Sequence, residues 1–214
     1  MSGAGQPLDF DIDCRLCPRL VALRHDVQVS HPAYHAAPVA PFGDPNGRLL
    51  IVGLAPGMHG ANASGRPFTG DHAGGILYRN IYEAGFSNRP ESLHADDGLK
   101  LIDCKITNAV KCLPPKNKPT GEEVNTCNRF LQAEVRHSPV LLALGSIAHQ
   151  AVLKAFNLKL SGWRFGHAAE HLLPGGHILL DSYHCSRYNT QTRRLTETMF
   201  ADIFRRARAL VDAA

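Results

Sequence analysis

Four of the six cysteines have the type and spacing to bind a metal centre. Cys14 and Cys17 are separated by two residues, Cys112 follows a predicted strand, and Cys127 lies on the next predicted helix. A Cys-x2-Cys pair can direct two thiolates at one centre, and two distant cysteines can complete a four-thiolate site for zinc or an iron–sulfur cluster. Spacing alone does not choose between these occupants, and four unrelated thiols are the alternative.

A glycine-rich loop is the second chemical feature. It follows an apolar strand and runs from Gly53 to Gly74, with Phe68 and Asp71 inside it. Loops between a strand and a helix usually take roughly 2–6 residues, so a loop of about twenty is usually functional or disordered. Glycines let backbone N–H groups approach a ligand, and the helix N-terminus that follows adds positive charge. The loop matches neither a Walker A nor a G-x-G-x-x-G pattern, and a purely structural loop is the alternative.

The elements that position these residues alternate along the chain. Apolar runs predict buried strands, and residues with helical spacing predict helices between them, so the class is α/β with a mainly parallel sheet. The predicted strands are 48–52, 106–110, 139–145 and 177–182. The predicted helices are 14–28 with Asp13 as N-cap, 75–86, one opened by a capping box at 120–123, 147–156 and 192–211. Residues 158–174 are expected to hold a short strand pair or an insert.

In a parallel sheet, ligands bind beyond the carboxyl ends of the strands. Three predicted loops meet that condition, at residues 53–74, 107–119 and 182–190. We therefore expect their polar side chains to converge on one site.

Composition sets further bounds. The 214 residues are 44% hydrophobic and 20% charged, which predicts a single folded domain over 1–214 with a loose tail at 1–12. The net charge of +4 is compatible with a polyanionic partner but is a weak signal. No apolar run has the roughly 18 residues needed to span a bilayer, and the acidic start lacks a signal-peptide pattern, so a cytoplasmic protein is expected.

Three segments resemble one known family. GLAPGMHGANASGRPFTGDHAG and SYHCSRYNTQTRRLT resemble the first and second motifs of the family 5 uracil-DNA glycosylases, and ITNAVKCLPP resembles the cluster-binding region that this family shares with the iron–sulfur family 4 enzymes. The resemblance covers roughly residues 14 to 205, and three long motifs in the same order are specific. It departs at Gly57, where the family often has Ala, and at Cys185, where Pro is expected.

The resemblance implies a fold, a cofactor and an activity. The fold is a three-layer α/β/α arrangement around a mainly parallel four-stranded sheet. The cofactor is a [4Fe-4S] cluster on Cys14, Cys17, Cys112 and Cys127, with zinc as the less expected occupant. The activity is hydrolysis of the N-glycosidic bond of uracil in DNA, and also of other deaminated bases such as hypoxanthine and xanthine. A monomer in a bacterial or archaeal cytoplasm, acting on DNA that contains a damaged base, is expected.

The resemblance also gives roles to residues of this chain, for a base that has been turned out of the helix. Phe68 stacks on the base, Asn108 reads its edge, and His184 donates a hydrogen bond to O2 as negative charge develops there. Asp71 is the candidate to activate water, although it can instead cap the following helix, and Leu54 stands where family 4 enzymes carry an acid. The other expected substrate contacts are Gly53, Ala55, Pro56 and Gly57.

Basic residues flank the predicted mouth of the site and are expected to contact DNA phosphates. The predicted DNA-binding residues are Lys116, Lys118, Arg187, Tyr188 and Arg193. Two other functions are consistent with the residues: a non-catalytic nucleic-acid-binding module on the same fold, and an N-glycosidase that acts on free nucleosides or RNA.

Overall fold

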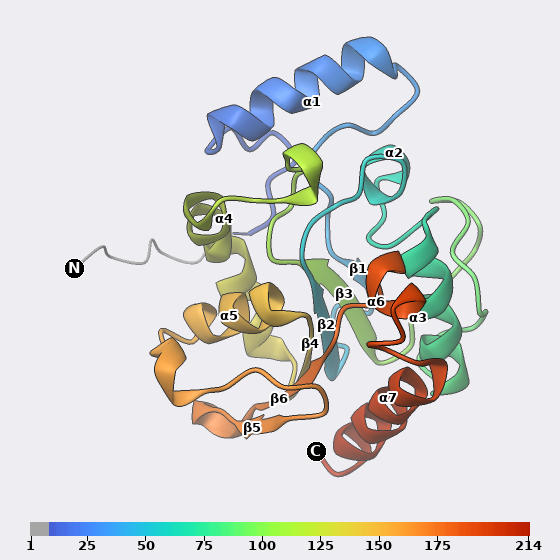
Figure 1. The fold of residues 1–214 in the computed structure, drawn as a ribbon, viewed down its shortest axis with the longest axis vertical. Helices are drawn as coiled ribbons and strands as arrows, with labels where there is room; N and C mark the ends of the chain where they lie inside the picture. Colours follow the sequence, from blue (N-terminus) through green and yellow to red (C-terminus); the bar gives the residue numbers. More distant parts are fainter. Residues whose placement is uncertain (1–8) are drawn as a thin grey trace.

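The computed structural model describes residues 9–214, which form one mixed sheet with helices on both faces (Figure 1). The strands are β1 (Phe42–Gly43), β2 (Leu49–Gly53), β3 (Cys104–Asn108), β4 (Val140–Leu144), β5 (Glu170–Leu172) and β6 (Ile178–Ser182), in the order β1-β3-β2-β4-β6-β5. Residues 1–8 of the predicted tail lie outside the described part of the chain.

The four central strands confirm the predicted parallel sheet, but the sheet is wider than the four strands expected. β3, β2, β4 and β6 are parallel, while β1 and β5 add antiparallel edges. Within 158–174, where a short strand pair or an insert was expected, the structure has a single strand, β5, which pairs with β6. β1 lies in residues 30–47, where no strand or helix was predicted, because a two-residue strand carries no periodic signal.

Two apolar layers hold the helices on the sheet. Helices α3 (His72–Glu83) and α7 (Glu197–Asp212) cover one face, where Leu77, Phe200 and Phe204 are fully buried. Helices α4 (Gly121–Glu134) and α5 (Ser146–Ala155) cover the other. The strands read as continuous apolar runs because both faces are buried, and the three-layer arrangement follows.

Helix α1 (Pro18–Ser30) begins four residues later than predicted. Pro18 stands in the first turn, where its missing N–H is not needed, and the capping position is Cys17 rather than Asp13. Cys14 and Cys17 therefore lie on a turn before the helix. In Figure 1, α1 lies away from the sheet, across α4 and the loop that follows β3.

Three other boundaries differ from the predictions. β3 begins and ends two residues before the predicted strand, but Ala109 and Val110 still donate backbone hydrogen bonds to Gly53 (2.9 Å) and Leu54 (3.0 Å). The long loop contains a short helix, α2 (Ala61–Ser64). The C-terminal helix α7 begins five residues later than predicted, because Thr196 caps it through the N–H of Met199, and the predicted loop 182–190 contains most of a short helix, α6 (Arg187–Gln191).

A buried histidine–aspartate network joins α5 to the β5–β6 edge. His149 Nδ1 lies 2.8 Å from one carboxylate oxygen of Asp181, and His171 Nε2 lies 3.2 Å from the other. His149 Nε2 lies 3.1 Å from the carbonyl oxygen of Trp163. Both His149 nitrogens thus face acceptors, which a doubly protonated ring satisfies. Burial opposes that charge, but hydrogen bonding to Asp181 and its charge raise the pKa of His149.

Short single-turn helices complete the described chain, at Pro115–Asn117, Val135–His137, Leu160–Gly162 and Pro174–Gly176. Among residues 9–214, no helix is both long and apolar enough to cross a membrane.

Candidate active site

The predicted site residues converge at the carboxyl edge of the sheet, where the parallel strands end. Gly53 is the last residue of β2 and Asn108 the last residue of β3, and the two are paired in register. His184 follows the end of β6 by two residues and lies beside Gly145, which follows β4. The parallel topology thus brings together groups that are far apart in the sequence.

Gly53, Phe68 and Asn108 pack against one another. A methyl group at Gly53 would lie 2.5 Å from both Asn108 Oδ1 and the ring of Phe68, so only glycine leaves room for these two side chains. Phe68 has a left-handed backbone (φ 54°), which is unusual for a bulky residue. Its carbonyl packs directly onto Gly74, where no Cβ would fit. Since such strain persists only where its surroundings impose it, the loop is a constrained structure.

Two buried polar atoms at this edge have no protein partner in the described chain. They are Oδ1 of Asn108 and Nδ1 of His184. The rings of Phe68 and His184 are roughly parallel, with centroids 6.0 Å apart. Since buried polar atoms are nearly always hydrogen-bonded, this pair is arranged for a bound group with a donor, an acceptor and a flat face.

His184 is held as a neutral ring. Burial lowers its pKa, and the charge of Asp71 opposes that shift only in part. The side-chain amide of Asn189 on α6 donates to the His184 carbonyl at 2.8 Å. This bond ties the loop that carries His184 to the following helix.

Asp71 caps α3 with one oxygen and leaves the other available. Its Oδ1 accepts the Gly74 N–H at 2.8 Å. Its Oδ2 accepts no hydrogen bond within the described chain and faces the Gly57–Gly60 turn, where a methyl group at Gly60 would lie 2.6 Å away. The cap and a chemical role are therefore not exclusive, because they use different oxygens.

The rest of the predicted binding loop frames this edge. Pro56 is buried and Ala55 is half-buried against the α4–α5 side, while the carbonyl of Gly57 accepts the Gly60 and Asn62 N–H groups. The loop is thus an ordered turn leading into α2.

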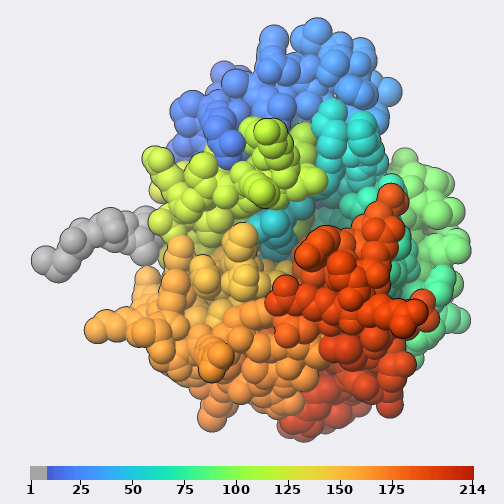
Figure 2. Space-filling view, viewed as in Figure 1, coloured from blue at the N-terminus to red at the C-terminus, as the bar shows by residue number. Residues whose placement is uncertain are grey.

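The predicted DNA-binding residues lie exposed on loops at the same edge. Lys116 and Lys118 follow β3, with Lys116 in a left-handed conformation (φ 54°), and Arg187 and Tyr188 open α6, with Tyr188 70% exposed. Arg193 lies between α6 and α7, also left-handed (φ 55°). Figure 2 shows the 113–119 loop and the α6 region on opposite sides of a central hollow.

A cavity of about 220 Å³ beside His184 was not predicted. It is lined by the first turn of α5 at Ser146, by Phe165 and Tyr183, and by Arg194, whose guanidinium lies 4.5 Å from the centre of the Tyr183 ring. A helix N-terminus and an arginine favour an anion here. The glycine–serine pair after β4 was the available signal, but Phe165 comes from the 158–174 segment, whose path the sequence does not reveal.

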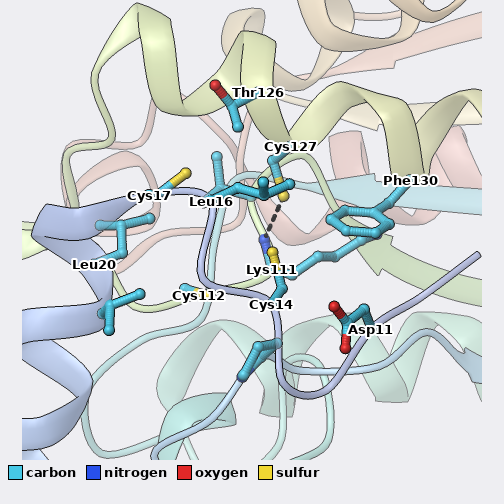
Figure 3. A pocket seen from close by; sticks show the side chains of 13 residues that line it. Asp11, Cys14, Leu16, Cys17, Leu20, Lys111, Cys112, Thr126, Cys127 and Phe130 are labelled. Atoms are coloured by element: carbon cyan, nitrogen blue, oxygen red, sulfur yellow. Dashed lines mark hydrogen bonds between the residues drawn. The ribbon is translucent and has the colours of Figure 1, made fainter. Parts of the chain in front are cut away.

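The four predicted ligand cysteines surround one pocket between α1, α4 and the segment after β3 (Figure 3). The backbone N–H of Lys111 donates to Cys127 Sγ at 3.3 Å. Arg24 of α1 donates to the Cys14 carbonyl at 3.0 Å and lies 4.0 Å from Cys112 Sγ. Burial raises the pKa of Cys112 to about 12 and that of Cys127 to about 11.

The other two cysteines are buried elsewhere. Cys104 lies inside β3, within the core layer of α3 and α7. Cys185 is fully buried, its Sγ lies 3.5 Å from the Ala73 carbonyl, and burial raises its pKa to about 12. A buried, protonated thiol is a poor nucleophile, so Cys185 packs the His184 loop onto α3.

Comparisons with known proteins show which proteins this chain resembles. The family model of the uracil DNA glycosylase superfamily matches residues 40–208. The chain is 51% identical over 205 residues to a type-5 uracil-DNA glycosylase of Thermus thermophilus, covering 92% of this chain and 93% of that protein. It is 40% identical to a type-5 enzyme of Pyrobaculum aerophilum, covering 92% and 89%. A type-4 uracil-DNA glycosylase of Archaeoglobus fulgidus is 34% identical over 122 residues, covering 56% and 54%.

Proposed function

Because this chain belongs to the uracil DNA glycosylase superfamily, and to its type 5 family, we propose that it hydrolyses the N-glycosidic bond of uracil in DNA with the residues at the carboxyl edge of its sheet. The observation that carries this proposal is the pair of unpartnered buried atoms, Asn108 Oδ1 and His184 Nδ1, next to the Phe68 ring. A flipped uracil offers a flat ring, an N3–H donor and carbonyl acceptors to these groups.

Asn108 reads the base edge. Its Oδ1 accepts from N3–H of uracil and its amide N–H donates to O4, whereas cytosine presents the opposite pattern at these positions. The close packing on Gly53 and Phe68 supports this role, because it fixes the amide at the end of β3.

His184 stabilises the departing base. As the glycosidic bond breaks, negative charge collects on O2, and a neutral imidazole N–H donates to it. The lowered pKa supports a neutral donor, which keeps its proton on the ring. A donor that is most useful in the transition state typically contributes about 10²–10³ in rate.

Asp71 acts on the sugar side. Its free Oδ2 orients water for attack at C1′ and stabilises the positive charge that develops on the sugar ring, while Oδ1 maintains the cap of α3. Leu54 has no polar group for this step. A positioned general base contributes about 10²–10⁴ in rate.

The DNA backbone is held around this mouth. Lys116, Lys118, Arg187 and Arg193 contact phosphates, and the N-terminus of α5 at Ser146 takes a further phosphate of the damaged strand. Tyr188 is exposed at the start of α6 and fills the space that the flipped base leaves.

The substrate range includes hypoxanthine and xanthine as well as uracil. In each of these three bases, a ring N–H lies beside a carbonyl group and can donate a hydrogen bond to Asn108 Oδ1. This proposal concerns bases that share that pattern, and a duplex with each lesion tests it.

A [4Fe-4S] cluster is bound by Cys14, Cys17, Cys112 and Cys127. The donor set fits such a group, because buried thiols of raised pKa become stable thiolates only beside a cation. When bound, the cluster supplies a rigid four-point link between the turn before α1, the segment after β3, and α4. Arg24 and the Lys111 N–H stabilise the thiolates from the protein side.

Strand nicking after alkali, on labelled duplexes that carry one uracil, hypoxanthine or xanthine, tests the proposal. Wild type should release uracil, and Asn108→Ala and His184→Ala should each lose at least about 10² in single-turnover rate. Gly121→Ala is the matched control, since nothing lies within 4 Å of the added methyl group. Full activity of both site variants would contradict the proposed roles, and binding without base release would leave only a DNA-binding module.

A further inference from the structure

A second groove lies beside the proposed mouth, between α3 and the segment that joins α6 to α7. Its volume is about 600 Å³, larger than the cavity beside His184. One wall is the face of α3 that carries His72, Ile76 and Arg79, and the opposite wall carries Thr190, Arg193 and Glu197. In Figure 1, α3 runs alongside α6 and α7.

Two arginines face this groove without an anionic partner. Within residues 9–214, the side chains of Arg79 and Arg193 form no ion pair and no hydrogen bond. In contrast, Arg205, Arg206 and Arg208 on the neighbouring α7 are all paired with carboxylates. Glu197 is the single acid in the groove wall, so the lining is net positive.

The groove is continuous with the site. His72 directly follows Asp71, and its Nε2 lies 3.2 Å from Thr190 Oγ1 on α6, so one end of the groove touches the helix that carries Arg187 and Tyr188. Arg79 is seven residues further along α3, which places it about 10 Å from that end on the same helix face. A strand that leaves the mouth past α6 therefore meets His72 first and Arg79 last.

We propose that this groove binds the phosphodiester backbone of DNA on one side of the lesion, with Arg79 and Arg193 as its phosphate contacts. The inference rests on the proposed function, because it takes the DNA path from the mouth defined there. Guanidinium groups match phosphate oxygens in shape and charge. Arg79 lies on α3 and Arg193 on the segment between α6 and α7, so the two walls of the groove each supply one arginine.

The salt dependence of binding to undamaged duplex DNA, measured by fluorescence anisotropy on the full-length protein, tests this assignment. Each phosphate contact contributes about 0.9 to the slope of log affinity against log salt. Arg79→Ala and Arg193→Ala should each reduce the slope by about 0.9, so that the affinity lost between about 50 and 200 mM salt becomes about 3.5-fold smaller. Glu197→Gln removes the negative charge from the groove wall and should therefore increase the affinity for DNA.

Arg136→Ala is the matched control, because Arg136 is exposed before β4 at the opposite edge of the sheet. It should leave the slope at the wild-type value. Duplexes with one neutral methylphosphonate locate the contact: the linkage that weakens wild type should have no effect on Arg79→Ala. Slopes of both arginine variants equal to wild type, with melting temperatures unchanged, would overturn the groove assignment.

Because this assay uses undamaged DNA, it does not depend on base release. If the wild type excises no uracil while both arginine variants show the reduced slope, the proposed function is contradicted and the groove is supported. A wild type that excises uracil while both arginine variants keep its slope contradicts the groove alone.

Discussion

Replacing Asp71 with Asn separates the two functions of one carboxylate. Oδ1 caps α3 through the Gly74 N–H at 2.8 Å, and Oδ2 faces the Gly57–Gly60 turn without a protein partner. Asn keeps an oxygen for the cap and loses the negative charge. Asp71→Ala removes both functions, and Asp71→Ser keeps a cap but no charge.

The expected losses of stability and of rate differ among the three substitutions at Asp71. Asn and Ser cap helices about as well as Asp, so Asp71→Asn should lose only the attraction of the charge to the helix N-terminus, about 0.3–1 kcal/mol of unfolding free energy. Asp71→Ala loses the cap as well as the charge, so it should lose about 1 kcal/mol more than Asn, which lowers the melting temperature by roughly a further 2–4 °C in a domain of this size. All three variants should lose about 10²–10⁴ in single-turnover rate.

Thermal unfolding and alkali-nicking of a uracil duplex measure the two effects on the same preparations. We expect Asp71→Ala to melt at a lower temperature than Asp71→Asn and Asp71→Ser, while all three variants have similarly reduced single-turnover rates. If the rate of Asp71→Asn is within about threefold of the wild-type rate, the role of Oδ2 is refuted. A threefold loss is far smaller than the loss expected on removing a general base. A rate that follows the melting temperature would mean that Asp71 acts only as a cap.

Three further outcomes follow from particular contacts. Gly53→Ala should cost about 1–3 kcal/mol of stability and most of the base-release rate, measured by urea unfolding and strand nicking, while Gly121→Ala should change neither. For His149, a folded-state pKa raised by Asp181 means that the stabilising pairing is fully present below about pH 6.5 and is lost as pH rises through that pKa. Urea unfolding across pH should therefore show His149→Gln most destabilised at acid pH, and an equal loss at every pH would argue against a charged ring. For the proposed iron–sulfur cluster, the absorbance at roughly 400 nm should be lost faster in air from Arg24→Met than from wild type, since the variant lacks the charge beside Cys112, and equal rates of loss would argue against a role of Arg24 at the proposed cluster site.

The sheet could be predicted because its four central strands are buried on both faces and read as apolar runs. β1 could not, since its two residues pair with β3 only through tertiary structure. The helix start at Pro18 was not predicted because Asp13 is a favoured N-cap residue type, whereas Cys17, which occupies the capping position, is not. Thr196, three residues before Met199, was a readable cap signal that would have placed the start of the last helix correctly.

The candidate site was accessible from the sequence where it depends on strand ends. Gly53 directly follows a predicted strand, and the roles of Gly53, Asn108 and His184 came from the resemblance of their motifs; the parallel pairing of β2 and β3 explains why Gly53 and Asn108 meet. That Asp71 caps α3 with one oxygen and leaves the other without a protein partner could not be predicted, because it depends on where each carboxylate oxygen points. The cavity wall at Phe165 depends on the path of an irregular segment that no periodicity describes.

The backbone bonds from Ala109 to Gly53 and from Val110 to Leu54 extend the β2–β3 ladder into the bases of two active-site loops. The Asn108 amide, which we propose reads the base, is therefore ordered when the protein folds, and little conformational entropy should be lost when DNA binds. On this proposal, the shape of a preformed site determines which bases fit. An engineer who wishes to admit a bulkier base should change the side chains above this ladder and keep the lengths of both loops.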